Sequence, residues 1–352
     1  MGQNDKENEM SAAAPAGERE DIVLNIEDLF VDYETDDDIV HAVNGVNIRL
    51  GREKTLGLVG ETGAGKTTTA KAIMNLIPNP PGVIKKGKIT LEGKDVLSMS
   101  DRELEEMRGK DVAMIFQDPM TALNPVYTVG DQIAETLQLH ENISSADAKK
   151  RAGEMLEIVG IPATRMNEYP HQFSGGMKQR VVIAIGLACN PKLLIADEPT
   201  TALDVTIQAQ ILEIMVNLKK QYRMSMIMIT HDLGIVAEVC DEVSVMYAGR
   251  VIEHGTLEDV FDHTKHPYTE GLFNSLPNID DRTAKLRPIP GLMPDPTNLP
   301  KGCAFAPRCP YATEACRTTE QKERWISDTH MVVCSAYDDP EFHIERSEVD
   351  NG

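Results

Sequence analysis

Long apolar runs are missing from this sequence, and so is any excess of basic residues. No stretch approaches the roughly 18–20 uninterrupted apolar residues of a membrane-spanning helix. The first 20 residues also lack the apolar segment of a secretory signal. We therefore expect a globular chain in the cytosol, because 352 residues of which 41% are hydrophobic can build a large core.

The shortage of basic residues is uneven along the chain. Lys and Arg number 35 against 56 Asp and Glu, which gives a net charge of −21. Residues 1–38 carry −11 of this charge and residues 338–352 carry −5. We expect acidic, disordered tails at 1–21 and 337–352 around a mildly acidic body. Such a body disfavours generic nucleic-acid binding, which requires basic surface. A salt-adapted cytosol is an alternative reason for the acidic tails.

One segment has the composition of a phosphate-binding loop. The apolar strand 56–59 is followed by GETGAGKT at 60–67, which fits the pattern GxxxxGK[ST], and then by a helix that we expect to end near residue 76, before Pro78. Lys66 would reach the β and γ phosphates of ATP, and the Thr67 hydroxyl would hold Mg²⁺. A glycine-rich turn with an incidental lysine is the alternative, which the flanking strand and helix disfavour. The predicted nucleotide-binding residues here are Gly60, Glu61, Thr62, Gly63, Ala64, Gly65, Lys66, Thr67 and Thr68.

Two further apolar strands end in reactive side chains. Strand 193–196 is followed by Asp197 and Glu198, and strand 226–229 is followed closely by His231. Strand ends at one edge of an α/β sheet face the ligand, so we expect these groups beside the phosphates. Asp197 would orient Mg²⁺, Glu198 would act as general base on the attacking water, and His231 would position that water. Taken singly, each could be a structural turn residue.

Residues 174–179, SGGMKQ, resemble the signature loop of ATP-binding cassette (ABC) proteins and precede an apolar helix expected at 179–189. In that family two cassettes pair head to tail, and each closes the ATP site of the other. The resemblance implies that Gln117 joins Mg²⁺ and the catalytic water, that Tyr33 stacks on adenine, and that residues 202–204 cross the dimer interface. It also implies that four residues contact the partner's nucleotide: Ser174, Gly175, Gly176 and Gln179.

The same resemblance defines the domains. It implies an α/β P-loop NTPase fold, RecA-like, with the ABC ATPase domain at 22–262 and a helical subdomain at about 118–190. A capping pair, Ser144 and Asp147, marks a helix within that subdomain. No coiled-coil insertion or second cassette is present, which disfavours the DNA-repair and translation-factor relatives. The preferred interpretation is the ATP-hydrolysing subunit of a membrane transporter.

Four of the six cysteines lie near the end of the chain, at Cys303, Cys309, Cys316 and Cys334. A disulfide framework is not expected in the cytosol, so metal ligation is the leading hypothesis. The spacings C-x5-C, C-x6-C and C-x17-C are irregular for a zinc ribbon, and wide intervals suit a four-iron cluster. Cys189 and Cys240 lie in apolar stretches and are expected in the core.

The residues around these cysteines carry a narrower resemblance. HPYTEGLFNSLP at 266–277 and GCAFAPRCPYATEAC at 302–316 resemble the C-terminal extension, here 263–336, of dipeptide and oligopeptide importer ATPases. Some of those proteins hold a 4Fe-4S cluster on four cysteines, which implies the same group here, with zinc as the alternative. The resemblance implies a peripheral ATPase on the cytoplasmic side of the cell membrane, driving peptide uptake.

Its implied partners are a second ABC ATPase subunit, two transmembrane permease subunits and an extracellular peptide-binding protein. A heterodimer of ATPases is expected first, although a homodimer is compatible with the sequence. Nickel or oligosaccharide import remains an alternative within the transporter class. A soluble ABC protein that is not part of a transporter and a regulatory nucleotide-binding protein without turnover are the alternatives from other classes.

Overall fold

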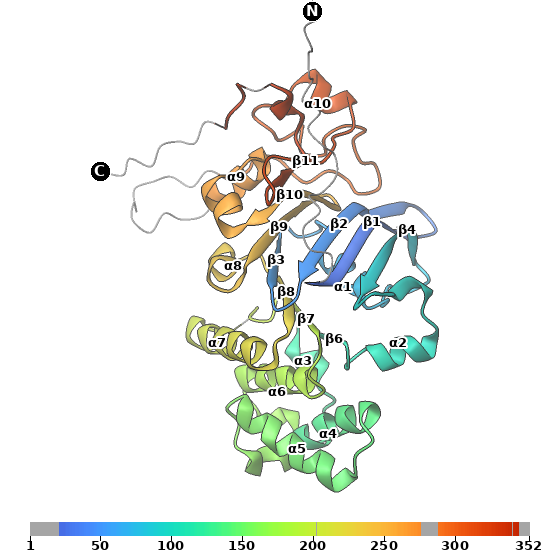
Figure 1. Ribbon diagram of the computed structural model, residues 1–352, viewed down its shortest axis with the longest axis vertical. Coiled ribbons are helices and arrows are strands. Elements are labelled where there is room, and N and C mark those ends of the chain that lie inside the picture. The colour runs from blue at the N-terminus through green and yellow to red at the C-terminus, as the bar shows by residue number, and fades with distance from the viewer. Residues whose placement is uncertain (1–20, 202, 276–287, 340, 345–352) are drawn as a thin grey trace, which may run out of the picture.

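The computed structural model describes residues 21–201, 203–275, 288–339 and 341–344. Figure 1 shows a helical part at one end, a strand-rich middle and a C-terminal extension at the other end. The expected acidic tail at 1–21 lies outside these ranges except for its last residue, and so does most of the tail at 337–352. None of the helices in the described ranges combines the length and the apolar character that a membrane span requires.

The middle of the molecule is built on a mixed sheet of eight described strands in the order β11-β12-β10-β9-β3-β8-β7-β6. Strands β6, β7, β8, β3 and β9 run parallel to one another, as is typical of an α/β core, whereas β10 pairs antiparallel with β9. All residues of β3, β7 and β8 are buried, because such strands are covered on both faces. The strand bounds are β3 Thr55–Val59, β6 Val112–Ile115, β7 Leu193–Asp197, β8 Ser225–Ile229, β9 Glu242–Tyr247, β10 Arg250–Thr256, β11 Arg324–Trp325 and β12 Met331–Val332.

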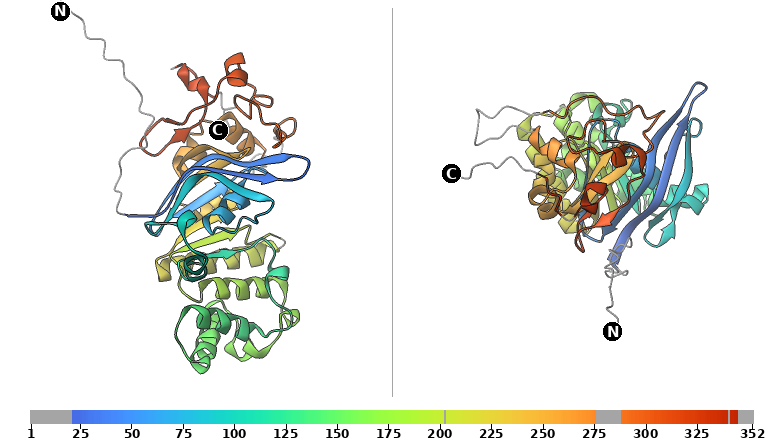
Figure 2. Two further views of the ribbon diagram at one scale, coloured as in Figure 1. Left: turned by 90° about the vertical axis from the view of Figure 1, so that its right-hand side faces the viewer. Right: turned by 90° about the horizontal axis from the view of Figure 1, so that it is seen from above.

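A second, antiparallel sheet runs along one side of this core, and Figure 2 shows the extension above it. Its order is β2-β1-β4-β5, and its long strands alternate buried and exposed residues as expected for a sheet with one solvated face. The bounds are β1 Ile22–Glu34, β2 Ile39–Gly51, β4 Gly82–Leu91 and β5 Lys94–Asp95.

Ten α-helices are present in the described ranges, and α3 to α6 cover the interval expected for the helical subdomain. Side-chain caps set several starts: Ser144 accepts from the Asp147 N–H at α5, at 3.1 Å, as the capping pair predicted. The bounds are α1 Lys66–Ile73, α2 Asp101–Met107, α3 Pro119–Ala122, α4 Val129–His140, α5 Ser145–Ile158, α6 Gly175–Leu187, α7 Val205–Tyr222, α8 Leu233–Val239, α9 Pro267–Asn274 and α10 Glu314–Thr318.

Two apolar clusters fill the interior. One joins the helical subdomain to one face of the eight-stranded sheet and includes Phe305 of the extension. The other lies between the two sheets, packs against α1, and includes Met331 and Val333 of the extension. Burial of these side chains is the main favourable contribution to the stability of the fold. The extension therefore shares both clusters with the cassette.

The extension also continues the sheet of the cassette. Strand β12 pairs antiparallel with β10, with Val332 opposite Glu253. The Glu253 side chain is 0% exposed and accepts from the His266 N–H at 2.9 Å, and it lies 2.9 Å from His330 Nε2. The boundary predicted at residue 263 therefore lies between segments that share one sheet and one core.

Three expected positions differ from the structure. Helix α1 ends at Ile73 instead of near residue 76, because Asn75 adopts a left-handed backbone with φ of 50°. The helix expected at 179–189 begins earlier, at Gly175, where Ser174 caps it. The acidic tail expected from 337 does not begin there, since Tyr337 packs against Phe342 with ring centroids 5.1 Å apart.

Candidate nucleotide site

The phosphate loop lies between β3 and α1, and three of its glycines have positive φ. A Cβ on Gly60 would lie 2.2 Å from the Met246 carbonyl oxygen, and one on Gly65 would lie 2.5 Å from that of Ala42. Only glycine fits such close approaches, so the backbone N–H groups of the loop can turn inward. The loop is thus shaped to receive an anion at the start of a helix.

Lys66 is folded back onto this loop. Its Nζ donates to the carbonyl oxygens of Gly60, at 2.7 Å, and Glu61, at 3.0 Å. The residue is 7% exposed, and burial lowers its pKa, while the nearby carboxylates of Glu198, Asp197 and Glu61 act in the opposite direction. A phosphate oxygen in the loop would take over the role of these carbonyl acceptors.

Asp197 and Thr67 meet beside Lys66. Asp197 ends β7, is 3% exposed, and accepts a hydrogen bond from the Thr67 hydroxyl. Burial raises the pKa of Asp197, although Thr67 and Lys66 oppose that rise. A hydroxyl and a carboxylate oxygen at one point are ligands that Mg²⁺ accepts together with phosphate oxygens. These two residues therefore fit the predicted magnesium site.

Glu198 is the centre of a hydrogen-bonded group of side chains. Its Oε2 accepts from Gln117 Nε2 at 2.8 Å, and its Oε1 lies 3.3 Å from His231 Nδ1. The Thr201 hydroxyl also donates to Oε2, at 2.8 Å. Three predicted catalytic residues, Gln117, Glu198 and His231, thus come together at the carboxyl ends of their strands.

The electrostatics of this group keep Glu198 ionised. Burial is the largest single influence and would raise the pKa of Glu198, but the hydrogen bonds from Thr201 and His231 together lower it below its ordinary value. The backbone of Glu198 has φ of 46°, a strained conformation for a non-glycine residue. Thr201 was not predicted as a site residue. Its position three residues after Glu198 was the only indication in the sequence.

Tyr33 lies on the adjoining strand β1 next to the start of α1. Its hydroxyl is 3.5 Å from the Thr68 hydroxyl, and a Cβ on Gly82 would lie 3.1 Å from its ring. The ring is partly exposed beside the phosphate loop. This position is compatible with stacking on a base.

The serine turn belongs to the helical part of the molecule. Ser174 caps α6 by accepting from the Met177 N–H at 3.4 Å, and Ser174 and Gly175 are exposed. A side chain on Gly176 would meet Ile207 at 2.5 Å, so the turn packs closely on α7. The turn therefore offers main-chain N–H groups to a neighbour.

Gln179 does not share this exposure. Its side chain belongs to a residue that is 1% exposed, and neither of its amide atoms has a hydrogen-bond partner among the described residues. The contact of Gln179 with the partner's nucleotide stays a prediction, and in this chain the side chain lies inside the helical layer. Of the residues 202–204, Ala202 lies outside the described residues, while Asp204 caps α7.

The four cysteines of the extension line one small cavity of about 20 Å³, together with His266 and Phe305. Burial raises the pKa of Cys303, that of Cys309 to about 12 and that of Cys334 to about 11. For Cys316 burial also acts upward, but hydrogen bonds from Thr313 and Ser335 lower its pKa overall. Segments 31 residues apart are thus brought together around one point.

The spacing of these thiols does not match a single ion. No group of three or more His, Cys, Asp or Glu side chains in the described ranges is arranged to hold a metal ion. A cavity of this size accommodates about one water molecule. The donor set of four thiols fits a thiolate-bound metal group in its chemistry.

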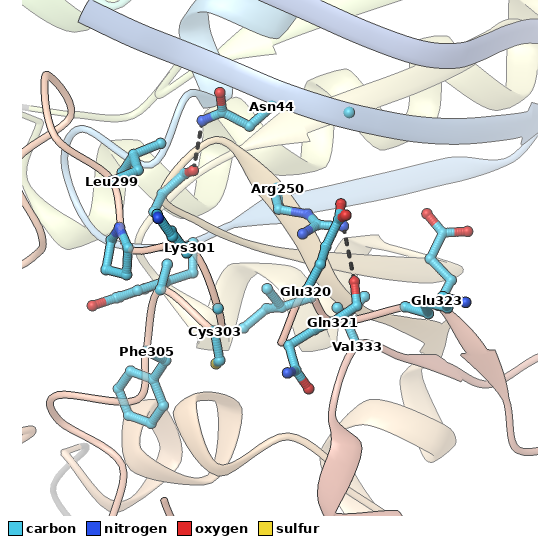
Figure 3. Close-up of a pocket in the computed structure, with 18 of the residues that line it drawn as sticks. Asn44, Arg250, Leu299, Lys301, Cys303, Phe305, Glu320, Gln321, Glu323 and Val333 are labelled. Carbon is cyan, nitrogen blue, oxygen red and sulfur yellow. Dashed lines mark hydrogen bonds between the residues drawn. The ribbon is translucent and has the colours of Figure 1, made fainter. Parts of the chain in front are cut away.

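A larger cavity of about 560 Å³ lies on the other side of Cys303 and Phe305, between the extension and strands β2 and β10. Figure 3 shows Arg250 on its wall, where an N–H donates to the Gln321 carbonyl oxygen at 3.2 Å. Cys303 and Phe305 line both cavities.

The two cysteines outside the extension are only partly as predicted. Cys240 is buried at the end of α8, where burial raises its pKa to about 12. Cys189 follows α6 and is half-buried, and burial raises its pKa to about 11. Both are unreactive thiols in the ordinary pH range.

Comparison with known proteins agrees with this geometry. The family model described as "ABC transporter" matches residues 43–201, and that described as "Oligopeptide/dipeptide transporter, C-terminal region" matches residues 252–316. The oligopeptide transport ATP-binding protein OppD of Bacillus subtilis (strain 168) is 54% identical over 313 residues, covering 88% of this chain and 87% of that protein. The dipeptide transport ATP-binding protein DppD of the same strain is 49% identical over 314 residues, covering 89% and 94%.

Solved structures show the same fold. A dimeric ATP-binding cassette in a post-hydrolysis state, bound to ADP and Pi, aligns with a TM-score of 0.60 at 25% identity, covering 66% of this chain and 98% of that one. A cassette from the cbiONQ transporter complex of Clostridium perfringens aligns with a TM-score of 0.59 at 30% identity, covering 69% and 92%.

Proposed function

The chain belongs to the ATP-binding subunits of oligopeptide and dipeptide ABC transporters, and on that premise we propose that it hydrolyses ATP to energise the import of short peptides. The observation that carries the proposal is the group of Gln117, His231 and Thr201 around Glu198, next to the phosphate loop. An ionised carboxylate held in this way is a general base without needing to rearrange first.

In the proposed reaction the residues of this chain bind the phosphates of ATP, orient the attacking water and remove its proton. Lys66 exchanges its carbonyl acceptors for phosphate oxygens, and Glu198 accepts the proton of the attacking water. His231 and Gln117 hold that water and the carboxylate in line. Thr67 and Asp197 are the residues that would hold Mg²⁺, which neutralises charge on the phosphates when bound.

We further propose that the site is completed by a second ABC ATPase subunit. The exposed turn at Ser174 and Gly175 supports this, because its N–H groups have the polarity to bind the γ-phosphate of a neighbour. The resemblance to a dimeric cassette gives the same support. A heterodimer is proposed, with a homodimer as the other outcome of mixing experiments.

The proposed membrane partners are two permease subunits, with an extracellular peptide-binding protein reached through them. The ATPase would then be peripheral, on the cytoplasmic side of the cell membrane. The names of the relatives favour peptides as cargo over nickel or oligosaccharides. A soluble ABC protein outside any transporter is the competing class, and it would not co-purify with permease subunits.

The four cysteines are proposed to bind a 4Fe-4S cluster, with zinc as the alternative. Support comes from their convergence on one cavity and from their chemistry, since four cysteine thiolates are the usual ligand set of such a cluster. Cys303, Cys309, Cys316 and Cys334 would hold the group. It would contribute a structural cross-link to a segment with little core of its own.

The deciding experiment is transport by the assembled complex in proteoliposomes. ATP-dependent uptake of a labelled oligopeptide, lost when Glu198 is replaced by Gln, is the expected result. Uptake of nickel or an oligosaccharide in place of peptide would contradict the proposed peptide cargo. ATP hydrolysis that is never coupled to any permease subunits would contradict the transporter assignment.

A further inference from the structure

Arg308 of the extension forms an ion pair with Glu61 of the phosphate loop. Arg308 Nη1 donates to Glu61 Oε2 at 2.7 Å, and Nη2 donates to Oε1 at 3.0 Å. The arrangement is bidentate, and the Arg308 side chain is only 5% exposed. The two residues are 247 positions apart, so the extension reaches directly into the nucleotide site.

The guanidinium group of Arg308 has several further contacts that fix its orientation. Its Nε donates to the Pro290 carbonyl oxygen at 2.9 Å, and Nη1 also lies 3.3 Å from the Tyr247 hydroxyl. The group lies over the rings of Tyr247 and Phe305, 5.9 Å and 6.0 Å from their centroids. A cation held by this many contacts has one orientation, and its carboxylate partner is therefore oriented too.

The main chain of Glu61 is held by the same cluster. Its N–H donates to the Tyr268 hydroxyl at 2.9 Å, and the Tyr268 ring packs against Tyr247 and Phe305. Its carbonyl oxygen accepts from the Ala64 N–H and from Lys66 Nζ. A displacement of Glu61 would therefore move both the turn of the loop and the lysine that meets the phosphates.

The charge of Glu61 gives the pair a role beyond packing. A carboxylate in a phosphate-binding loop repels a bound triphosphate, and this repulsion is strong where water is partly excluded. Arg308 neutralises that carboxylate and holds it against the extension. If Arg308 only stabilised the fold, its loss would not change the affinity of the site for ATP.

We propose that Arg308 and Tyr268 are positioning residues for ATP: together they neutralise and orient Glu61, so the C-terminal extension is a working part of the nucleotide site. This rests on the ATPase assignment and is independent of the cargo. Loss of either residue raises the dissociation constant and the KM for ATP more than it lowers kcat, because the loop is misplaced while Glu198 and His231 stay in position.

The test uses the full-length chain, its ATP affinity by nucleotide titration, and its steady-state hydrolysis. Arg308→Met is expected to weaken ATP binding by about tenfold, the size of a typical coupling between contacting charged groups. Glu61→Gln added to Arg308→Met is expected to restore much of that loss, since no uncompensated carboxylate is left. The matched control is Arg324→Met, which removes another arginine of the extension that pairs with Asp338.

Tyr268→Phe keeps the test decisive should Arg308→Met fail to fold. It removes only the acceptor of the Glu61 N–H, and the expected weakening is about threefold, in the range of one hydrogen bond. Metal content and melting temperature are compared across the variants. Equal ATP affinity in wild type, Arg308→Met and Tyr268→Phe, with only the melting temperature lowered, would overturn the proposal. A wild-type chain that binds no ATP would instead refute the ATPase assignment.

Discussion

The Thr201 hydroxyl donates a hydrogen bond to Oε2 of Glu198 at 2.8 Å. The same oxygen accepts a hydrogen bond from Gln117, which follows another strand. The pair lies within one turn after β7, where Glu198 has a left-handed backbone. This hydrogen bond helps to keep the Glu198 carboxylate ionised and fixed in orientation. Its removal therefore tests the role of Glu198 as general base.

Thr201→Val should shift the acid side of the pH profile of kcat. The hydrogen bond from Thr201 lowers the pKa of Glu198, so its loss raises that pKa. A base with a raised pKa is protonated at higher pH, and activity therefore begins to fall at higher pH than in wild type. Thr201→Ser, which keeps the hydroxyl, should retain the wild-type profile. Identical acid limbs in Thr201→Val and wild type would remove Thr201 from this role.

Lys66→Ala should weaken ATP binding by about tenfold to a hundredfold, as expected for the loss of a charged hydrogen bond to phosphate. Lys71→Ala in the same helix is the control, because Lys71 lies beyond the phosphate loop. Fluorescent nucleotide titration measures both. Unchanged affinity in Lys66→Ala would mean that the triphosphate lies elsewhere.

Ser174→Ala should slow hydrolysis in the assembled ATPase pair without weakening the ATP affinity of its own chain. Its hydroxyl caps α6, and the exposed turn is the proposed contact with the second ATPase subunit. Ser144→Ala removes a comparable cap, at α5 in the same helical part, and each loss costs about 1 kcal/mol of stability. Equal slowing by both variants would point to destabilised helices instead of a lost contact across the interface.

The cysteine cavity should contain metal in protein purified without oxygen. Four iron and four sulfide per chain, with an absorption band at about 400 nm, are expected for the cluster. Cys316→Ser should lose the metal, whereas Cys189→Ser, outside the cavity, should keep it. One zinc per chain would support the zinc site in place of the cluster. A wild-type protein without metal would refute both the cluster and the zinc site.

The sequence predicts the catalytic strand ends well because local patterns determine them. An apolar run followed by Asp197 and Glu198, or closely by His231, places each polar group at the edge of a parallel sheet, and the structure brings them together there. The glycines of the phosphate loop are equally local, since Gly60, Gly63 and Gly65 all have a positive φ.

Contacts between distant segments could not be predicted in this way. Nothing near Arg308 in the sequence indicates that it meets Glu61, because the pair depends on how the extension docks on the cassette. The burial of Gln179 also follows from helix packing and not from its motif. The addition of β11 and β12 to the sheet similarly depends on pairing with β10, since each has only two residues.

Glu198→Gln in the reconstituted transporter is the most direct test of the proposed function. Gln keeps the shape of the side chain but cannot accept the proton, so single-turnover hydrolysis should fall by about a hundredfold or more while ATP affinity stays within the wild-type range. The ATP-bound pair of cassettes should then remain closed, visible as a stable dimer. Hydrolysis at the wild-type rate in this variant would contradict the account.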